Sequence, residues 1–355
     1  MRYLITGGAG FIGSNYAHRL LARGEGVTIY DNLSRRGADA NLRWLHSKFG
    51  SEAFGFVHGD VRDAALLTAT AHDADVIVHL AAQVAVTTSV EHPREDIEIN
   101  AMGTFNVLEA ARYSPKRPMV LYASTNKVYG SLEGLVVEEL TSRYALRDYP
   151  HGIPESYPTD FHSPYGCSKG AGDQYVRDYA RIYDLRTVVF RQSCIYGPRQ
   201  FGIEDQGWVA WFVIAAQLGK PITIYGDGKQ VRDVLYIEDL LDAYDAAVRE
   251  MADASSTSQI SGQIYNLGGG PDNQIAIWRE FGPVLTALHG REIPVMHGDW
   301  RPGDQRIFVA DIRKAQRELD WTPSVDVGTG LRELYRWVSE HKDLLETYVG
   351  AGAGS

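Results

Sequence analysis

Residues 3–21 read YLITGGAGFIGSNYAHRLL, and this stretch decides the fold. The apolar run at 3–6 is typical of a buried strand, and the amphipathic run after the glycines is typical of a helix. Between them, Gly7 permits a tight turn, Gly10 lets a pyrophosphate approach the backbone, and Gly13 lets helix and strand pack closely. The helix N-terminus then faces the phosphates. The stretch therefore predicts a dinucleotide-binding strand-turn-helix unit.

A second predicted strand, at 27–30, ends in a carboxylate. Asp31 follows Gly13 at the distance where an acidic residue binds the adenosine ribose hydroxyls, and it would repel a 2′-phosphate. Arg35 and Arg36 stand close by, and either could pair with such a phosphate. The carboxylate favours NAD over NADP as the cofactor.

Apolar runs and amphipathic segments alternate through the first half of the chain. Strands are expected at 3–6, 27–30, 54–58, 76–79, 119–123 and 187–191. Helices fit between them at 11–23, 64–71, 102–112 and 167–183. This order predicts an α/β fold, a doubly wound parallel (Rossmann) sheet with helices on both faces.

The second half is less regular, with glycine-rich turns (GDGKQVRD, NLGGG) and a shorter helix expected near 278–288. We expect a smaller substrate-binding lobe there. Residues 1–195 plus about 229–262 would form the NAD-binding domain, and about 196–228 plus 263–346 the nucleotide-sugar-binding lobe. Residues 347–355 are expected to be a disordered tail.

Composition favours a soluble enzyme. The 355 residues are 44% apolar, and the net charge is -10 without a long basic run, which argues against nucleic acid and anionic membranes as partners. No apolar segment approaches about 18 residues, and no signal sequence precedes the first strand. The two cysteines, Cys167 and Cys194, form no disulfide framework, and no Cys/His cluster has metal spacing. We expect no metal, and a reducing cytoplasm as the compartment.

A tyrosine and a lysine in HSPYGCSKGAGDQY supply the candidate chemistry. Tyr165 and Lys169 lie one helical turn apart on one face. An ammonium near a phenol lowers the pKa of the phenol, which could then take a proton from a sugar hydroxyl near neutral pH. The spacing also occurs on solvated helix faces, but here the glycine loop and the pair Ser124 and Thr125 accompany it.

Eight motifs together resemble the extended short-chain dehydrogenase/reductases, which act on nucleotide sugars. They are TGGAGFIG, DNLSR, HGDVRD, HLAA, STNKVYG, SPYGCSK, YGPRQ and RPGDQR, and the resemblance covers about residues 1 to 340. STNKVYG, DFHSPYGCSKGAGDQY, RQFGIEDQGWVAWF and GKQVRDVLYIEDL resemble the branch that epimerises C2 of CDP-linked 3,6-dideoxyhexoses. The resemblance implies tightly held NAD and a homodimer built on the helices near 102–112 and 167–183.

The resemblance also implies a role for each residue of the site. Thr125 would hydrogen-bond the reacting sugar oxygen, Tyr165 would be the general base and acid, and Lys169 would tune it and grip the nicotinamide ribose. The cofactor-binding residues would be Gly7, Gly10, Phe11, Ile12, Gly13, Asp31, Asn32, Ser34, Arg35, Asp60, Val61, Leu80, Ala81, Ala82, Asn100, Ser124, Tyr165, Lys169 and Gln192. The substrate-binding residues would be Thr88, Asn126, His162, Cys194, Gln206, Trp208, Arg232, Arg301 and Asp304.

Within the substrate set, Arg232 and Arg301 would contact the diphosphate, because an arginine fork binds phosphate in a bidentate way. Asp304 could bind the nucleotide ribose. His162 could touch the sugar or simply pack at the helix entry. Trp208 could wall the pocket or belong to the core.

Two departures from the wider family bear on the reaction. Asn126 and Lys127 stand where dehydratases of the family carry an acidic pair, which weakens a water elimination. Cys194 stands where many 4-epimerases have an asparagine, and we interpret it as a small buried residue rather than a reactive thiol.

The predicted reaction is epimerisation at C2 of a CDP-linked deoxysugar through a transient 2-keto sugar, with no external reductant consumed. Three alternatives stay open: a UDP-hexose 4-epimerase, a dehydratase or decarboxylase, and a non-catalytic NAD-binding protein. Residue spacing alone fixes neither the base nor the sugar position.

Overall fold

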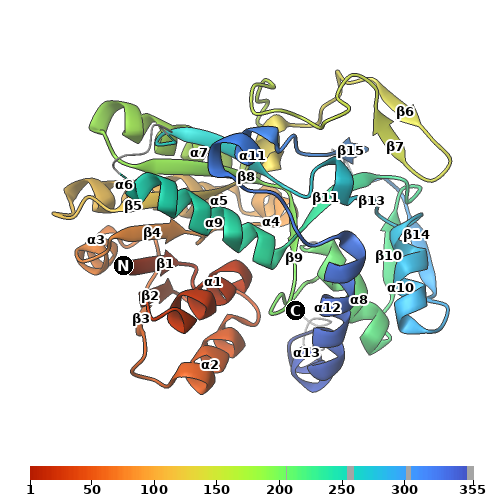
Figure 1. Cartoon of the computed structure of the whole chain (residues 1–355). Coiled ribbons are helices and arrows are strands. Elements are labelled where there is room, and N and C mark those ends of the chain that lie inside the picture. Colours follow the sequence, from red (N-terminus) through yellow and green to blue (C-terminus); the bar gives the residue numbers. More distant parts are fainter. Residues whose placement is uncertain (205, 254–259, 301–304, 350–355) are drawn as a thin grey trace.

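The computed structural model describes residues 1–204, 206–253, 260–300 and 305–349 (Figure 1). Its centre is a parallel sheet of seven strands, which confirms the predicted fold class. In spatial order the strands are β12 (Gln263–Leu267), β8 (Thr187–Gln192), β5 (Met119–Thr125), β4 (Val76–His79), β1 (Arg2–Thr6), β2 (Gly26–Asp31) and β3 (Gly55–His58). The strand order reverses beside β1, and ligands of doubly wound sheets bind at such a point, outside the carboxyl ends of the strands.

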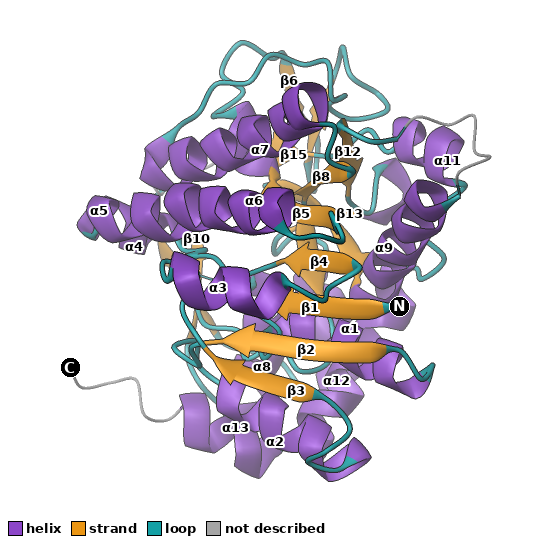
Figure 2. Ribbon diagram, turned by 90° about the vertical axis from the view of Figure 1, so that its left-hand side faces the viewer, coloured by secondary structure: helices purple, strands orange, loops and turns teal. Residues whose placement is uncertain are grey.

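Helices cover both faces of this sheet (Figure 2). One face lies against α1 (Phe11–Ala22), α2 (Ala38–Phe49) and α9 (Ile237–Ala252), and the other against α3 (Ala64–Ala71), α6 (Gly103–Tyr113) and α7 (Ser163–Tyr183). Each face has its own hydrophobic core. Along β1, Tyr3 and Ile5 point into the core beneath α1, α2 and α9, and Leu4 points into the core beneath α3, α6 and α7. Because helices cover β4 on both faces, all four residues of its run VIVH are buried.

The predicted helices agree with the structure except at their ends. The main difference is α7, which begins at Ser163, four residues before the expected start, so that Tyr165 lies in its first turn. Pro164 fits there because the first turn of a helix needs no N–H from it. The helices α2 and α9 were not predicted.

Smaller sheets, built mostly by the second half of the chain, lie beside the main one (right-hand side of Figure 1). One contains β9 (Cys194–Tyr196), β11 (Val231–Tyr236), β13 (Gln274–Ala276) and β15 (Ile307–Phe308). The others are the pairs β10 (Ile222–Tyr225) with β14 (Val295–Gly298) and β6 (Val137–Glu139) with β7 (Tyr144–Leu146). The accompanying helices are α8 (Trp208–Leu218), α10 (Phe281–His289), α11 (Arg313–Leu319), α12 (Val327–Glu340) and α13 (Lys342–Val349).

Two strands lie across the expected boundaries between the lobes. β12 was assigned to the smaller lobe, yet it pairs in parallel with β8 and forms the edge of the main sheet. β11 was assigned to the NAD-binding domain, yet it pairs with β9, β13 and β15. The division into two lobes itself stays a prediction.

The expected tail begins too early. Residues 347–349 belong to α13, and Tyr348 donates a hydrogen bond of 2.6 Å from its hydroxyl to Asp39 on α2. This contact ties the last described helix to the first half of the chain. Residues 350–355 lie outside the described part.

The described residues contain neither a membrane-spanning helix nor a metal-binding cluster. No helix there is long and apolar enough to cross a membrane. No group of three or more His, Cys, Asp or Glu side chains there could hold a metal ion.

Candidate active site

The predicted catalytic residues meet at the carboxyl edge of the main sheet. Thr125 is the last residue of β5 and lies opposite Gln192, the last residue of β8. The first turn of α7 brings Tyr165 to the same edge, and Lys169 follows one turn later. The sheet and one helix thus assemble the three predicted groups.

A hydroxyl from another helix caps the turn that carries Tyr165. His162 precedes α7 without making a side-chain cap. Instead, Ser89, on α4 (Val86–Glu91), accepts a hydrogen bond of 3.1 Å from the backbone N–H of Tyr165. Ser163 accepts another, of 3.2 Å, from the N–H of Gly166. These bonds satisfy N–H groups that a helix start otherwise leaves unpaired.

The phenol of Tyr165 is buried and shares a hydrogen bond with Thr125. Burial raises the pKa of the phenol above its ordinary value, whereas the Thr125 hydrogen bond and the charge of Arg35 lower it. The prediction that this pKa is lowered is wrong for this structure, because burial outweighs the stabilising groups.

The ammonium of Lys169 is buried too, with 4% of the residue exposed. Its Nζ lies 4.3 Å from the centre of the Tyr122 ring, in a cation–π contact. Burial lowers the pKa of Lys169 to about 7, and the carboxylates of Asp173 and Asp96 oppose that fall. The lysine is thus poised to change charge near neutral pH.

A buried ion pair lies behind the lysine. Asp173 is one turn beyond Lys169 on α7, and Arg191 of β8 binds its carboxylate through Nε and Nη2. Ser124 donates a hydrogen bond of 2.8 Å to the same carboxylate. The hydroxyl of Ser124, predicted to contact the cofactor, therefore holds β5 to α7.

The glycine loop has the shape of a phosphate cradle. Gly7 has φ +70°, and a Cβ there would lie 2.7 Å from the amide nitrogen of Ala81. A Cβ on Gly13 would lie 2.4 Å from the carbonyl oxygen of Gly7. Gly10 precedes α1, and its helix start has no side-chain cap within the described residues, so the N-terminal N–H groups face outward for an anion.

The carboxylate of Asp31 closes this cradle. It accepts hydrogen bonds from the N–H groups of Ala9, at 2.9 Å, and Leu33, at 2.8 Å. Burial raises its pKa above the ordinary value, and these backbone bonds oppose the rise. A carboxylate has about four acceptor positions, so the group can still accept ribose hydroxyls.

Other predicted cofactor contacts surround the same edge. Asn32 donates a hydrogen bond of 2.9 Å to Asp60, whose carboxylate also binds Arg62. Leu80 and Ala81 form the turn after β4, against the glycine loop. The predicted residues at or near this edge are Phe11, Ile12, Ser34, Val61, Ala82 and Asn100.

Two predicted cofactor side chains have protein partners. The Gln192 amide donates to the Tyr244 hydroxyl at 2.5 Å. The Asn100 amide donates to the carbonyl oxygen of Gln83 and to the side chains of Asp96 and Ser168. Their cofactor contacts stay predictions.

Two cations and one carboxylate, Asp233, surround the thiol on the substrate side. Burial raises the pKa of the Cys194 thiol, and Arg232 and Lys127 lower it through their charge, which places both cations near that sulfur. Trp208 lies near the same thiol and packs edge-on against Phe281. A weakly acidic, half-buried thiol agrees with a packing role for Cys194.

Beside the catalytic threonine, Asn126 is buried, and its Oδ1 lies 3.5 Å from the hydroxyl oxygen of Thr125. Lys127 donates a hydrogen bond of 3.2 Å to Gln305. Neither can serve as the carboxylic acid that a dehydration needs.

The remaining predicted substrate residues have fewer contacts that bear on the site. Thr88 is half-buried on α4, and His162 is exposed. Gln206 is half-buried, and its side-chain oxygen has no partner among the described residues. Arg301 and Asp304 lie outside the described residues.

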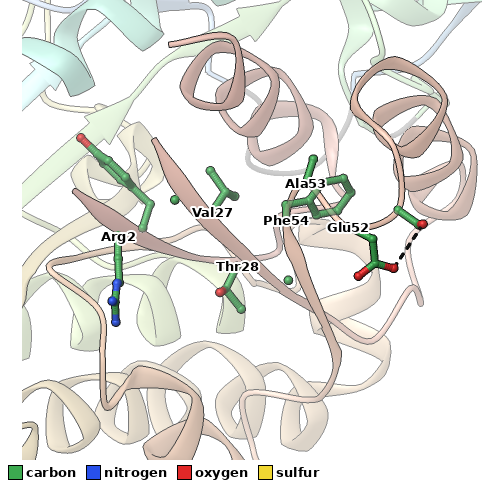
Figure 3. A pocket seen from close by; sticks show the side chains of 10 residues that line it. Arg2, Val27, Thr28, Glu52, Ala53 and Phe54 are labelled. Atoms are coloured by element: carbon green, nitrogen blue, oxygen red, sulfur yellow. Dashed lines mark hydrogen bonds between the residues drawn. The ribbon is translucent and has the colours of Figure 1, made fainter. Parts of the chain in front are cut away.

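A surface hollow of about 430 Å³ lies at the opposite end of the strands (Figure 3). Arg2, Val27, Thr28, Glu52 and Phe54 are among the residues that line it. They belong to the beginnings of β1 and β2 and to the segment before β3, so this hollow is separate from the catalytic groups.

Sequence reasoning missed several residues that support the site: Ser89, Asp96, Asp173, Arg191 and the buried His79. Two carried a signal. Arg191 is a charge inside the apolar run TVVFRQ, and Asp173 lies four residues after Lys169 on the same helix face. Together they predict an ion pair, because a buried charge needs a partner.

Comparisons with known proteins show the family of the chain. The family model described as GDP-mannose 4,6 dehydratase matches residues 4–334. A CDP-paratose 2-epimerase of Salmonella typhi is 46% identical over 96% of this chain and 99% of its own length. A UDP-glucose 4-epimerase of Mycolicibacterium smegmatis is 35% identical over 93% of this chain and 96% of its own length.

Solved structures give the same result. DesIV, a dTDP-glucose 4,6-dehydratase from Streptomyces venezuelae solved with NAD bound, superimposes with a TM-score of 0.82 and 30% identity. The match covers 98% of this chain and 100% of that one. The chain belongs to the GDP-mannose 4,6-dehydratase family of extended short-chain dehydrogenase/reductases.

Proposed function

We propose that this protein is an NAD-dependent nucleotide-sugar epimerase that inverts C2 of a CDP-linked 3,6-dideoxyhexose, converting CDP-paratose to CDP-tyvelose. One observation carries the epimerase assignment: Thr125 and Tyr165 share a hydrogen bond beside buried Lys169, while Asn126 and Lys127 follow the threonine. The site can therefore move a proton on a sugar oxygen, and neither residue after the threonine is an acid that could eliminate water. The 46% identity to a CDP-paratose 2-epimerase supports the choice of sugar and carbon.

Three side chains carry out the proton chemistry. Tyr165 takes the proton of the sugar hydroxyl and later returns it, Thr125 positions that oxygen, and Lys169 supplies positive charge to the phenolate. The glycine loop and Asp31 fit the pyrophosphate and adenosine ribose of NAD, which agrees with NAD in related structures. When bound, NAD accepts a hydride from the sugar carbon and gives it back.

The site must also leave room for the oxidised sugar to rotate. The 2-keto sugar has lost its hydrogen from C2. It must turn its opposite face toward the cofactor before that hydrogen is returned. The cationic groups Lys127 and Arg232 would hold the diphosphate during this rotation, since charge-assisted bonds to phosphate are strong. The sugar alone then needs to move.

A sugar deuterated at C2 provides the test. Purified protein is incubated with CDP-paratose labelled at C2, without added NAD, and the products are followed by NMR. We expect CDP-tyvelose with its C2 deuterium retained, and no solvent deuterium at C2 when the unlabelled sugar is used in heavy water. Inversion at C4, or solvent label at C2, would overturn the proposal.

The main competing function is a UDP-hexose 4-epimerase, favoured by the 35% identity to a UDP-glucose 4-epimerase. It would use the same three side chains on a different sugar position. Parallel incubations with CDP-, UDP-, GDP- and dTDP-sugars separate the two. Dinucleotide released by denaturing the protein should be NAD, because Asp31 disfavours a 2′-phosphate.

We also propose a homodimer built on α6 and α7. These helices and the segments beside them expose large apolar side chains: Val86, Val90, Ile97, Met102, Tyr113, Tyr175, Ile182 and Tyr183. A group of such side chains on one set of helices is typical of a protein interface.

A further inference from the structure

The helix α5 (Pro93–Ile97) places an aspartate against the catalytic helix. Asp96 is fully buried, with 0% of the residue exposed. Its Oδ2 accepts a hydrogen bond from the hydroxyl of Ser168, the residue before Lys169. Its Oδ1 accepts one of 3.1 Å from the amide of Asn100. Burial of a carboxylate is costly, so a fully buried aspartate needs compensation.

Asn100 extends these contacts into a small network. Its amide also donates to the Ser168 hydroxyl at 3.1 Å and to the carbonyl oxygen of Gln83 at 3.0 Å. Its carbonyl oxygen accepts the N–H of Gln83 at 2.9 Å. The carboxylate of Asp96 is therefore fixed in place and, through Ser168, fixes the turn of α7 that connects Tyr165 to Lys169.

Two carboxylates act on the Lys169 ammonium, and they differ in their charge balance. Asp173 is bound at both oxygens by Arg191, so the pair is close to neutral. The hydrogen-bond partners of Asp96 in the described chain are the hydroxyl of Ser168 and the amide of Asn100, which are neutral. Burial raises the pKa of Asp96, whereas the Ser168 hydrogen bond and the charge of Lys169 lower it, so the lysine is the cation that stabilises this carboxylate.

We propose that Asp96 is a positioning residue for the catalytic pair: its buried carboxylate anchors the turn of α7 between Tyr165 and Lys169, and it adds to Asp173 a second negative charge that acts on the Lys169 ammonium. The roles of Tyr165 and Lys169 rest on the proposed function. The charge acts on both groups, because it favours the ammonium of Lys169 and disfavours the phenolate of Tyr165. It therefore helps to keep the proton on Tyr165 until substrate and cofactor are in place.

Other groups around the lysine set the background for a test. They are Tyr165 and Asp173 on α7, Asp96 on α5, Tyr122 on β5 and the neutral His79 on β4. Asp96→Asn leaves the other groups in place. It keeps the shape of the side chain and one acceptor oxygen but removes the charge. A purely structural role would survive this substitution with little change at Lys169.

The pKa of Lys169 can be measured directly. Protein labelled with ¹³C at the lysine ε-carbon is titrated by NMR, and the Lys169 signal is assigned by its loss in Lys169→Met. In Asp96→Asn we expect the pKa of Lys169 to fall by about half a unit to one unit, because an attractive charge is lost. Asp96→Glu, which keeps the charge, should restore the wild-type value. If Asp96→Asn does not fold, Asp96→Ser takes its place.

Asp239 supplies a matched control. It is also buried, and it accepts hydrogen bonds from the N–H and hydroxyl of Ser324 and the N–H of Val325. Asp239→Asn removes a buried charge from α9 and should leave the pKa of Lys169 unchanged. An unchanged Lys169 pKa in folded Asp96→Asn, or an equal fall in Asp239→Asn, would overturn the proposal.

Turnover gives a second readout. Because Lys169 must carry a proton, the alkaline limb of kcat against pH should move to lower pH in Asp96→Asn by the amount measured in the titration. An alkaline limb that stays in place while the pKa falls would contradict the counter-charge role. The NMR titration needs no substrate, so a failure of the proposed function does not affect it.

Discussion

The guanidinium of Arg191 donates two hydrogen bonds to the carboxylate of Asp173, at 2.9 and 3.0 Å, inside the protein. The two side chains are 3% and 0% exposed. The pair joins β8 to α7, and Ser124 adds β5 to the same carboxylate. The strand that carries Thr125 and the helix that carries Lys169 are thus joined by this buried pair.

Arg191→Met should destabilise the protein by about 3–5 kcal/mol, because it leaves the carboxylate of Asp173 buried without its charge partner. Urea unfolding measures this loss. Arg313→Met is the control, because Arg313 pairs with Asp311 but is 56% exposed, and it should change the unfolding free energy little. Equal effects of the two substitutions would show that burial of the pair is unimportant.

His79 should make stability depend on pH. It bridges Thr6 and Thr104 inside the core, and burial lowers its pKa to about 3. Since an unfolded histidine has a pKa of about 6.5, the unfolded chain gains a proton first, and stability falls as pH drops from about 6.5 toward 3. Between pH 7 and pH 5 the loss due to this group should be about 2 kcal/mol.

Urea unfolding at both pH values tests this, with His79→Asn compared with the wild type. The variant should lose that part of the pH dependence, whereas His72→Asn, at an exposed site, should keep it. A wild-type pH dependence in His79→Asn would contradict the assignment.

Tyr165→Phe should lower turnover of the nucleotide sugar by about a hundredfold or more, because it removes the oxygen that moves the proton. The ring that fills the buried site remains, so folding and retained NAD should change little. Steady-state kinetics and release of dinucleotide after denaturation measure the two properties. More than about a tenth of the wild-type activity would exclude the assigned role.

Tyr175→Glu should convert the proposed dimer to a monomer. The ring is 53% exposed and packs edge-on against Phe105, so it bridges α6 and α7 on the proposed interface. A charge placed there would have to be desolvated in the dimer. Sedimentation velocity measures the change, and Met296→Glu, at an equally exposed site on β14, should keep the wild-type mass.

The fold could be predicted because its signals are local. The glycine loop at 7–13, the apolar run VIVH and the spacing of Tyr165 and Lys169 are each contained in a short stretch of chain. Residues 263–267 were assigned to the smaller lobe rather than to the main sheet because a short apolar run before three glycines looks the same at a sheet edge as in a separate lobe.

The supporting residues of the site could not be predicted in the same way. Ser89 and Tyr165 are 76 positions apart, and Asp96 and Ser168 are 72 apart. Each is an ordinary polar residue in its own segment, and only the packing of α4 and α5 on α7 gives it a partner. The pKa of Tyr165 was mispredicted for a related reason, since burial depends on the whole fold.

The Ser89 cap connects the site to the outer surface of the molecule. The same helix, α4, exposes Val86 and Val90, so a neighbour that covers those side chains also restrains the hydroxyl that holds the Tyr165 amide. The rate at which that amide proton exchanges with solvent then depends on how often α4 separates from α7. Hydrogen exchange at Tyr165 should therefore be a direct measure of whether a second subunit is bound.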